Sequence, residues 1–465
     1  MDGATIHRIA LGEDRHPDAW QLALAGDAWP RVLIAPTGSG KTAAVTLGWA
    51  TRRLHSPDDT PRRLVWCLPM RTLVEQTARA VEEWLRKLAT DEVNGEGRLP
   101  RPEDVRVLMG GVDANGWLER PERPAVLVGT QDMLLSRALM RGYASSRALW
   151  PMEFALLHED AQWVFDEVQL MGAGRATSAQ LDAFRQSEAE RARRDGRAAG
   201  ARSRSLWISA TLDPDWLATV DHPAPAAAAV VQVDADAAPG GRLAKLARAP
   251  KRLTRSPAAP ASAKKADIAD YVGRLADEIV IAHRDGRMTL AIVNRVDRAQ
   301  ALRDAIEKRL PGRPAAPALA LVHSRFRAAD PLGRWRLPST RTKRTRTGAS
   351  SWPRRRSRRT WTSRRPSCLP SWPPWSSLVQ RFGRANRYAE LPDGADVRWT
   401  DLLRPAADAT ASDKEHRGAG EALRDRGAAG CAVSTDRVDR CRGGAPSPAR
   451  RRRPTAPRDP PQGPR

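Results

Sequence analysis

The sequence predicts an α/β fold with two tandem domains, each a parallel β-sheet flanked by helices, followed by a disordered basic tail. Three observations predict it. Short apolar runs alternate with helical patterns from residue 31 to residue 217, and a second, shorter alternation begins at residue 266. After residue 332 the composition changes abruptly. Alternating strands and helices are typical of a parallel sheet with helices on both faces.

The first domain is expected to span residues 1–220. Its apolar runs have the length of buried strands, and the segments between them, such as 72–89, repeat apolar residues at helical spacing. The expected strands are 31–35 (RVLIA), 63–69 (RLVWCLP), 105–109 (VRVLM), 125–130 (AVLVGT), 163–168 (WVFDEV) and 205–211 (SLWISAT).

Residues 221–265 are rich in Ala, Pro and basic residues, which predicts a linker with one possible strand, VVQVDA. The second domain is expected over 266–404, and residues 405–465 form a tail that is too poor in apolar residues to fold. The second domain's expected elements are a helix over 266–286, a strand over 289–294, a helix over 298–310 and a strand over 318–324.

The overall charge suggests a nucleic-acid partner, although its distribution weakens that inference. The formal net charge is +24, and most of the excess lies after residue 332. The four cysteines have no disulfide-like or zinc-like spacing, which favours a reducing compartment. The N-terminus has no apolar signal region, and no stretch is long and apolar enough to span a membrane. The expected location is the cytoplasm.

The segment APTGSGKT, residues 35–42, follows the first strand and predicts a phosphate-binding P-loop. Gly38 and Gly40 let backbone N–H groups close around phosphate oxygens, with Thr37 and Ser39 in the same loop. Lys41 is expected to contact the β- and γ-phosphates of ATP, and the Thr42 hydroxyl to bind Mg²⁺. A chance glycine-rich turn is the other interpretation, but the strand before it and the helix after it favour the P-loop.

Asp166 and Glu167 end the run WVFDEV, so they are expected at the carboxyl edge of the sheet, near a P-loop on a neighbouring strand. Asp166 is expected to hold Mg²⁺ and Glu167 to activate the attacking water. By itself an acidic pair at a strand end is common and weak evidence. Together with the P-loop it predicts an ATP hydrolase.

Further blocks in the same order make the chain resemble a superfamily 2 helicase, which has two RecA-like domains. Gln21 stands where such helicases contact adenine. The resemblance implies that LPMRTLVEQT (68–77) and GTQDMLLSRAL (129–139) grip nucleic acid, through residues Pro69, Arg71, Thr72, Thr130 and Gln131. It also implies that SAT couples hydrolysis to domain movement through Ser209 and Thr211, and that VQRFGRANR brings Gln380, Arg384 and Arg387 to the γ-phosphate.

DEVQLMG (166–172) and HSRFR (323–327) are similar to the helicase of type I CRISPR interference systems. That resemblance implies an ATP-dependent translocase on single-stranded DNA, recruited by a CRISPR surveillance complex. The family's His-Asp nuclease domain has no counterpart in the residues, so we expect it to be separate or lost. A superfamily 2 RNA helicase, or a chain that binds ATP and nucleic acid without mechanical work, are the alternatives.

Residues 333–377 depart from the family pattern. From Arg334 to Ser377 there is no acidic residue, Ile or Val, where a strand and a loop of the form ATQxxEAGxD are expected. A basic, Trp-containing insert that binds nucleic acid is one interpretation. A shifted reading frame is the one we favour, because residues 349–363 then can encode Ile-Val-Val-Ala-Thr-Gln-Ala-Val-Glu-Ala-Asp-Val-Asp-Val. This copy is therefore expected to be degenerate or mis-sequenced there.

Overall fold

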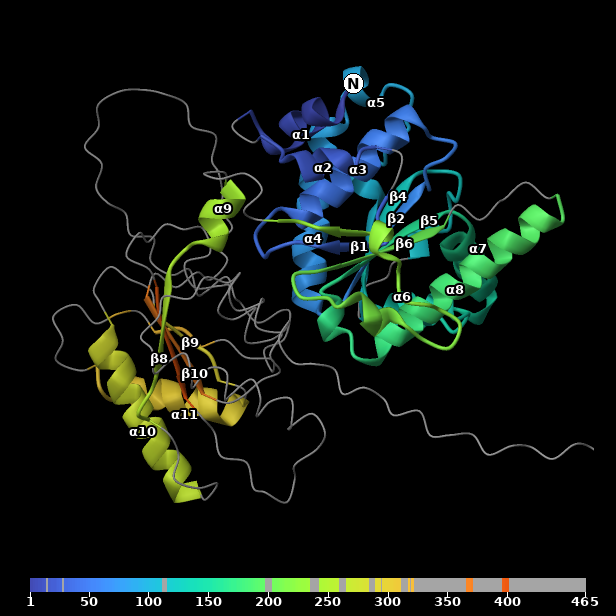
Figure 1. Ribbon diagram of the computed structural model, residues 1–465. Helices are drawn as coiled ribbons and strands as arrows, with labels where there is room; N and C mark the ends of the chain where they lie inside the picture. The colour runs from blue at the N-terminus through green and yellow to red at the C-terminus, as the bar shows by residue number, and fades with distance from the viewer. Residues whose placement is uncertain are drawn as a thin grey trace, which may run out of the picture.

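The computed structural model describes residues 1–13, 16–26, 29–110, 115–196, 203–234, 242–258, 265–283, 289–293, 295–310, 317, 319–321, 365–370 and 395–400. Within these residues the chain forms two parallel sheets (Figure 1). No helix in the described ranges combines the length and apolar character that crossing a membrane requires.

The first sheet has seven strands in the order β3-β4-β2-β5-β6-β1-β7, and every neighbouring pair is parallel. Because the strands are parallel, all their carboxyl ends lie along one edge of the sheet. The strand bounds are β1 (Val32–Ile34), β2 (Arg63–Leu68), β3 (Val105–Leu108), β4 (Ala125–Thr130), β5 (Ala161–Asp166), β6 (Arg204–Ser209) and β7 (Val230–Gln232).

Helices cover both faces of this sheet (Figure 1). The helices α1, α3 and α4 pack on one face, and α6, α7 and α8 on the other. The helices associated with this sheet are α1 (Gly3–Leu11), α2 (Ala19–Ala23), α3 (Lys41–His55), α4 (Arg71–Leu88), α5 (Asp91–Asn94), α6 (Gln131–Ala138), α7 (Trp150–Glu159) and α8 (Ala173–Arg194). Short 3-10 turns connect several of them.

The alternation of side chains along each strand divides the core into two layers. In β2, Leu64 and Trp66 pack on the α3 and α4 side, whereas Val65 and Cys67 pack on the α6 and α7 side. All six residues of β2 are buried. A strand that is buried on both faces explains why its sequence is a continuous apolar run rather than an alternating one.

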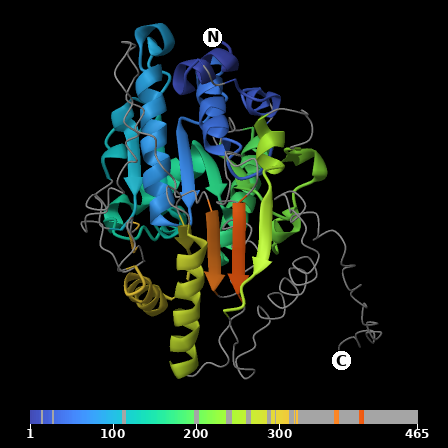
Figure 2. The same cartoon turned by 90° about the vertical axis from the view of Figure 1, so that its left-hand side faces the viewer.

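The second sheet has four parallel strands in the order β8-β11-β10-β9 (Figure 2). A small core beside it joins Tyr271, Leu275 and Ile279 to Leu302 and Ile306. The elements of this part are α9 (Arg242–Ala247), β8 (Lys251–Arg255), α10 (Lys265–Ala282), β9 (Thr289–Ala291), α11 (Val296–Glu307), β10 (Arg365–Pro370) and β11 (Ala395–Thr400).

The predicted α/β fold class is confirmed. All six strands expected in the first domain are present, and each begins and ends within two residues of the expected position. Residues 221–265, for which the sequence predicted a linker, contribute β7 to the first sheet and β8 to the second. The expected strand over 289–294 is the shorter β9. The expected strand over 318–324 and the tail over 405–465 lie mostly or wholly outside the described residues.

Candidate ATP and nucleic-acid site

Three of the predicted motifs follow three strands that are consecutive in the first sheet, β5, β6 and β1. The sequence predicted that the acidic pair and the P-loop lie on neighbouring strands. The sheet order corrects this, because β6 lies between β5 and β1. Since β6 ends in Ser209, the acidic pair, the SAT segment and the P-loop meet at one edge.

The P-loop connects β1 to α3 and depends on two glycines. Gly38 and Gly40 have φ of 86° and 89°, a left-handed backbone that strains any residue with a Cβ. A Cβ on Gly40 would also lie 3.0 Å from the Gln21 side-chain nitrogen. The sequence pattern therefore identified the residues that this turn requires.

Lys41 is the first residue of α3, and its side chain folds back into the loop. Its Nζ donates to the carbonyl oxygens of Ala35 at 2.8 Å and Pro36 at 3.3 Å, and the residue is buried. Ser39 is fully buried between these groups. The ammonium thus occupies the loop interior, where phosphate oxygens are expected to replace the carbonyl partners.

Asp166 is the last residue of β5 and is buried. Burial, followed by the neighbouring charge of Glu167, raises its pKa to about 7, while the charge of Lys41 opposes this shift. One Asp166 oxygen accepts a hydrogen bond from the Glu167 backbone N–H at 2.8 Å. Burial and the like charge of Glu167 thus both disfavour the ionised form of this carboxyl.

Glu167 is fixed by a chain of hydrogen bonds that runs to the end of β6. Its backbone has φ of 53°, which is strained for a residue other than glycine. Gln169 donates from Nε2 to Glu167 Oε2 at 2.6 Å, and its own Oε1 accepts from the Ser209 hydroxyl at 2.6 Å. Ser209 Oγ in turn accepts from the Thr211 backbone N–H at 3.0 Å.

The donor set at this edge suits a magnesium ion. Asp166 supplies a buried carboxyl group and Thr42, the second residue of α3, a hydroxyl group, and Mg²⁺ prefers hard oxygen ligands. Its binding would offset the charge repulsion between Asp166 and Glu167 that contributes to the raised pKa. The residues therefore fit the ion that the sequence predicted.

Gln21 lies on α2 and contacts the P-loop rather than open space. Its Nε2 donates to the Ser39 carbonyl at 3.2 Å, and its Oε1 accepts from the Asp18 backbone N–H at 2.8 Å. The side chain is buried. Both ends of the amide are therefore engaged here, so contact with adenine requires it to exchange at least one of these partners.

The residues expected to grip nucleic acid follow β2 and β4, which are neighbours on the other side of β5. Arg71 and Thr72 begin α4 and are exposed, and the half-buried Pro69 lies two positions before Arg71. Arg71 donates from Nη2 to the Gly110 carbonyl at 2.7 Å. At the carboxyl edge of the sheet, the ATP motifs therefore follow β5, β6 and β1, and the residues expected to grip nucleic acid follow β2 and β4.

Thr130 and Gln131 stand at the start of α6, where β4 ends. Gln131 packs so closely against α8 that a Cβ on Gly174 would lie 2.6 Å from its Oε1. That oxygen is buried and has no hydrogen-bond partner within the described part of the chain. A larger residue at position 174 would therefore displace the end of the Gln131 side chain.

The family comparison agrees with this arrangement. Residues 16–220 match the model of the DEAD/DEAH box helicase family, and this range contains the P-loop, the Asp-Glu pair and the SAT segment.

Solved helicase structures share the fold at low sequence identity. The DUF1998 helicase MrfA bound to DNA aligns with 91% of this chain and 53% of its own, at 13% identity and a TM-score of 0.53. Mss116p bound to single-stranded RNA and AMP-PNP aligns with 90% of this chain and 84% of its own, at 12% identity and a TM-score of 0.52. The Mycobacterium smegmatis helicase Lhr bound to single-stranded DNA and AMP-PNP aligns with 93% of this chain and 51% of its own, at 19% identity and a TM-score of 0.51. No curated protein sequence is significantly similar to this chain.

The chain spans about half the length of MrfA and of Lhr. Identities of this size establish a shared fold alone.

Sequence reasoning missed Gln169, the fourth residue of DEVQ, whose amide joins Glu167 to Ser209. The signal was present, because a side chain just past a strand end lies at the same edge as the pair before it. Three expected residues, Gln380, Arg384 and Arg387, lie outside the described residues, as does HSRFR.

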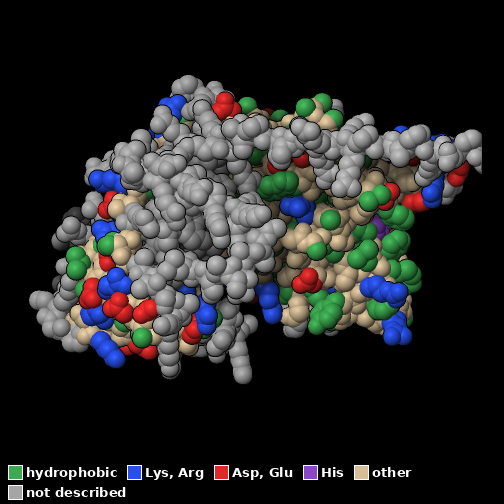
Figure 3. Space-filling view, turned by 60° about the horizontal axis from the view of Figure 1, so that its bottom comes forward, with side chains coloured by type: hydrophobic (Ala, Val, Ile, Leu, Met, Phe, Trp, Pro, Cys, Tyr) green, Lys and Arg blue, Asp and Glu red, His purple; other side chains and the backbone are tan. Residues whose placement is uncertain are grey.

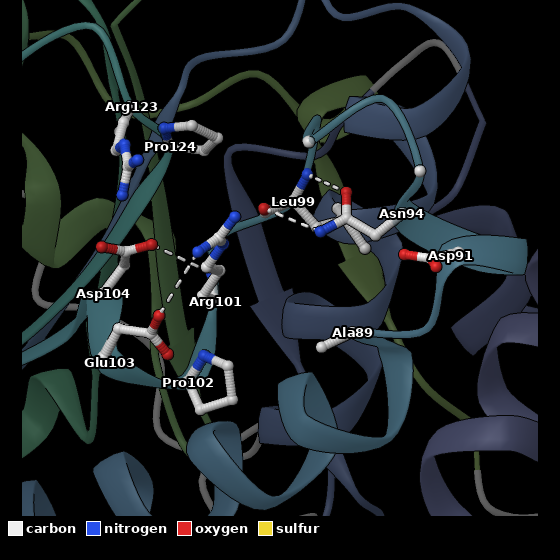
Figure 4. Close-up of a pocket in the computed structure, with 12 residues that line it drawn as sticks. Ala89, Asp91, Asn94, Leu99, Arg101, Pro102, Glu103, Asp104, Arg123 and Pro124 are labelled. Carbon is white, nitrogen blue, oxygen red and sulfur yellow. Dashed lines mark hydrogen bonds and ion pairs between the residues drawn. The ribbon is translucent and has the colours of Figure 1, made fainter.

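A cavity of about 440 Å³ lies away from the helicase motifs (Figure 4). Its walls include residues that immediately precede β3 and β4, so it opens near the opposite edge of the sheet. Its polar groups largely bond to one another: Arg101 contacts Asp104 and Glu103, and Asn94 pairs with the Leu99 backbone. These contacts stabilise the turn before β3.

Proposed function

We propose that this chain uses Mg-ATP hydrolysis to move along single-stranded DNA as a helicase of CRISPR interference. The observation that carries the ATPase part is the hydrogen-bonded chain from Glu167 through Gln169 to Ser209, beside the buried Asp166 and Lys41. It connects the residue expected to activate water with the segment expected to couple hydrolysis to movement. The helicase domain match supports the same proposal.

Each residue at the edge has a distinct part in this chemistry. Lys41 and the P-loop amides hold the β- and γ-phosphates, and Thr42 and Asp166 hold Mg²⁺, which neutralises charge that develops on the phosphates. Glu167 orients the attacking water and accepts its proton. Gln169 fixes the Glu167 carboxylate, since its amide donates to that carboxylate from Nε2 and accepts from Ser209 at Oε1. Arg384 and Arg387 complete the site from the second domain in this proposal.

Single-stranded DNA and the CRISPR setting are the finer parts of the proposal. DEVQLMG and HSRFR support them by resemblance, which also implies a recruiting surveillance complex and a separate His-Asp nuclease. The structural relatives do not choose the substrate, because MrfA is bound to DNA, Lhr to single-stranded DNA and Mss116p to single-stranded RNA. The strand would contact Pro69, Arg71, Thr72, Thr130 and Gln131 along the carboxyl ends of β2 and β4.

A second candidate function is binding of ATP and nucleic acid without mechanical work. It is favoured by β10, an interior strand of the second sheet that contains Pro366 and Pro370. Prolines cannot donate to a β-ladder, so a sheet built on this strand is a weak support for domain movement. Both candidates predict that the chain binds ATP and nucleic acid, and only the first predicts that nucleic acid stimulates ATP turnover.

The deciding experiment measures ATP turnover with no nucleic acid, with single-stranded DNA and with single-stranded RNA, alongside displacement of a labelled strand. Stimulation by DNA with strand displacement supports the main proposal. Stimulation by RNA alone identifies an RNA helicase instead. ATP binding without stimulation by either supports the second candidate. Lys41→Ala is the control for the P-loop: unchanged ATP binding in this variant would refute the assigned site.

A further inference from the structure

A second surface of the helicase domain has features of a binding site and lies outside the proposed groove. We name residues 139–152, which join α6 to the first turn of α7, the connector surface. Large apolar side chains are exposed here, with Tyr143 65% and Leu139 50% exposed. The segment has no acidic residue, and Glu153, which follows it, is fully buried.

The connector surface is held rigidly from beneath. Arg137 and Glu153 form a buried ion pair at 2.7 Å, and Arg137 also donates to the Tyr143 carbonyl at 3.2 Å. Ser136 Oγ accepts from the Tyr143 backbone N–H at 3.1 Å, and Trp150 Nε1 donates to the Gly142 carbonyl at 3.3 Å. A loop fixed in this way loses little conformational entropy on binding a ligand.

Backbone strain singles out the same segment. Among the described residues, three residues other than glycine have positive φ: Glu167 at the ATP site, and Met140 and Ala144 on the connector surface, both at 56°. Such conformations persist only where the surroundings impose them, and they concentrate at functional sites. The strain at Met140 and Ala144 therefore points to a role for this loop beyond connecting two helices.

The chemistry of the connector surface favours nucleic acid. The guanidinium groups of Arg141 and Arg147 lie 6.0 Å and 5.9 Å from the centroid of the Trp150 ring. Tyr143, in the same segment, presents an exposed aromatic ring. Arginine with aromatic rings, in a segment without carboxylates, is the combination that binds phosphates and stacks on bases. Figure 3, in which the bottom of Figure 1 comes forward, shows hydrophobic, basic and acidic side chains interspersed on the described part of the surface.

The position of the connector surface allows one strand to reach both places. The helix α6 starts at Gln131, in the proposed groove, and has eight residues. At 1.5 Å per residue it is roughly 12 Å long, so its far end lies within reach of a strand that leaves the groove. Because most of α6 is buried, a strand that continues past Gln131 would cross the surface beside this helix to reach Tyr143.

We propose that the connector surface is a second contact site for single-stranded nucleic acid, with Tyr143 stacking on a base and Arg141 and Arg147 contacting phosphates. The strand's course rests on the proposed groove, whereas the surface itself rests on its own geometry and charge. A protein partner is the competing occupant, because tyrosine, methionine and arginine are also frequent in protein interfaces.

The test measures fluorescence anisotropy of labelled oligothymidylates of about 8 and about 30 nucleotides, lengths chosen below and above the reach of one groove. The variants are Tyr143→Ser and the pair Arg141→Ser with Arg147→Ser. The control is Arg79→Ser, which removes an exposed arginine (69% of its side chain) from α4. Each connector variant should weaken the long oligonucleotide about tenfold, by the loss of one stacked base or its phosphate contacts. The short oligonucleotide and the control should be unaffected.

Unchanged affinity for the long oligonucleotide in both connector variants would overturn the proposal. So would an equal loss in the Arg79→Ser control, which would mean that only net charge matters. Light scattering provides the remaining outcome: a change in self-association without a change in DNA binding identifies a protein interface and also overturns it. The groove is tested separately by Arg71→Ser, which should weaken both lengths; if it weakens neither, the groove fails while the Tyr143 result stands.

Discussion

The two parallel sheets of this protein differ most in their interior strands. In the first sheet, β2 is buried along all six residues and pairs in unbroken register with β4 and β5. In the second sheet, β10 lies between β11 and β9 and contains Pro366 and Pro370. Its register with β9 shifts between Arg365 and Ser367, at the first of these prolines.

The difference shows where sequence and fold agree. A proline lacks the N–H that a ladder needs, so prolines are normally confined to edge strands and bulges. Local preference, apolar pattern and position all agree in β2, whereas in β10 the position requires a strand and the sequence opposes one. This conflict favours our hypothesis that residues 333–377 are encoded out of frame.

The largest expected effect comes from repairing that segment. We expect replacement of residues 349–363 by the shifted-frame sequence to raise DNA-stimulated ATP turnover on the order of 10³-fold, because an arginine delivered to the γ-phosphate is worth 10³–10⁵ in kcat. Steady-state ATPase assays of both chains measure it. A chain with residues 349–363 shuffled is the matched control.

Two results would contradict the repair hypothesis. One is a repaired chain whose turnover equals that of the shuffled control. The other is a set of intact nucleotide reads with one continuous frame, together with homologous chains that carry the same Arg/Trp stretch. The second result would mean that β10 is read in its native frame, whereas the first would mean that residues 349–363 do not limit turnover.

The second prediction tests whether the first sheet supplies the chemistry. Glu167→Gln should lower kcat roughly 10²- to 10⁴-fold, since a general base contributes that much, while ATP binding remains. Turnover and binding of a fluorescent ATP analogue are measured in parallel. A variant that loses binding as well would show that Glu167 supports the P-loop structurally and would break the assignment of roles.

The sequence predicted the first sheet well because its signals are local. The P-loop requires glycines at 38 and 40, where φ is positive, and buried strands such as β2 are continuous apolar runs. The sequence could not predict the order of the strands, which depends on long-range pairing, and it therefore missed that β6 separates β5 from β1. The place of Gln169 just past a strand end could be read from the sequence, but its partner Ser209, 40 positions away, could not.

The third prediction concerns acid sensitivity of the first domain. Burial, and then the charge of Arg185, lower the pKa of His158 from 6.5 to about 4, and its Nε2 contacts the Ala138 carbonyl at 2.8 Å. Between these pH values the unfolded chain binds a proton there and the folded chain does not. The free energy of unfolding should therefore decrease as pH falls from 6.5 to 4, by about 3 kcal/mol.

Urea denaturation at several pH values measures this slope, and His158→Gln should flatten it because the amide does not titrate. Probes in each sheet sharpen the comparison. If the part that contains β10 loses structure at a higher pH than the part that contains β2, the two sheets differ in stability as well as in sequence. If the free energy of unfolding of His158→Gln falls with pH as steeply as that of the original chain, other groups cause the acid sensitivity.

The smallest expected effect isolates the prolines themselves. Pro366→Val and Pro370→Val each restore a backbone donor to β10, and one ladder hydrogen bond contributes about 1 kcal/mol. Hydrogen exchange of the β9 and β11 amides should slow correspondingly, by roughly fivefold for each substitution. A proline introduced into β2 at Val65 should speed the exchange of the β4 and β5 amides, and by a larger factor, because that strand pairs on both sides without a break. If the β10 substitutions leave exchange unchanged, the prolines are accommodated at no cost and the contrast between the sheets is one of sequence alone.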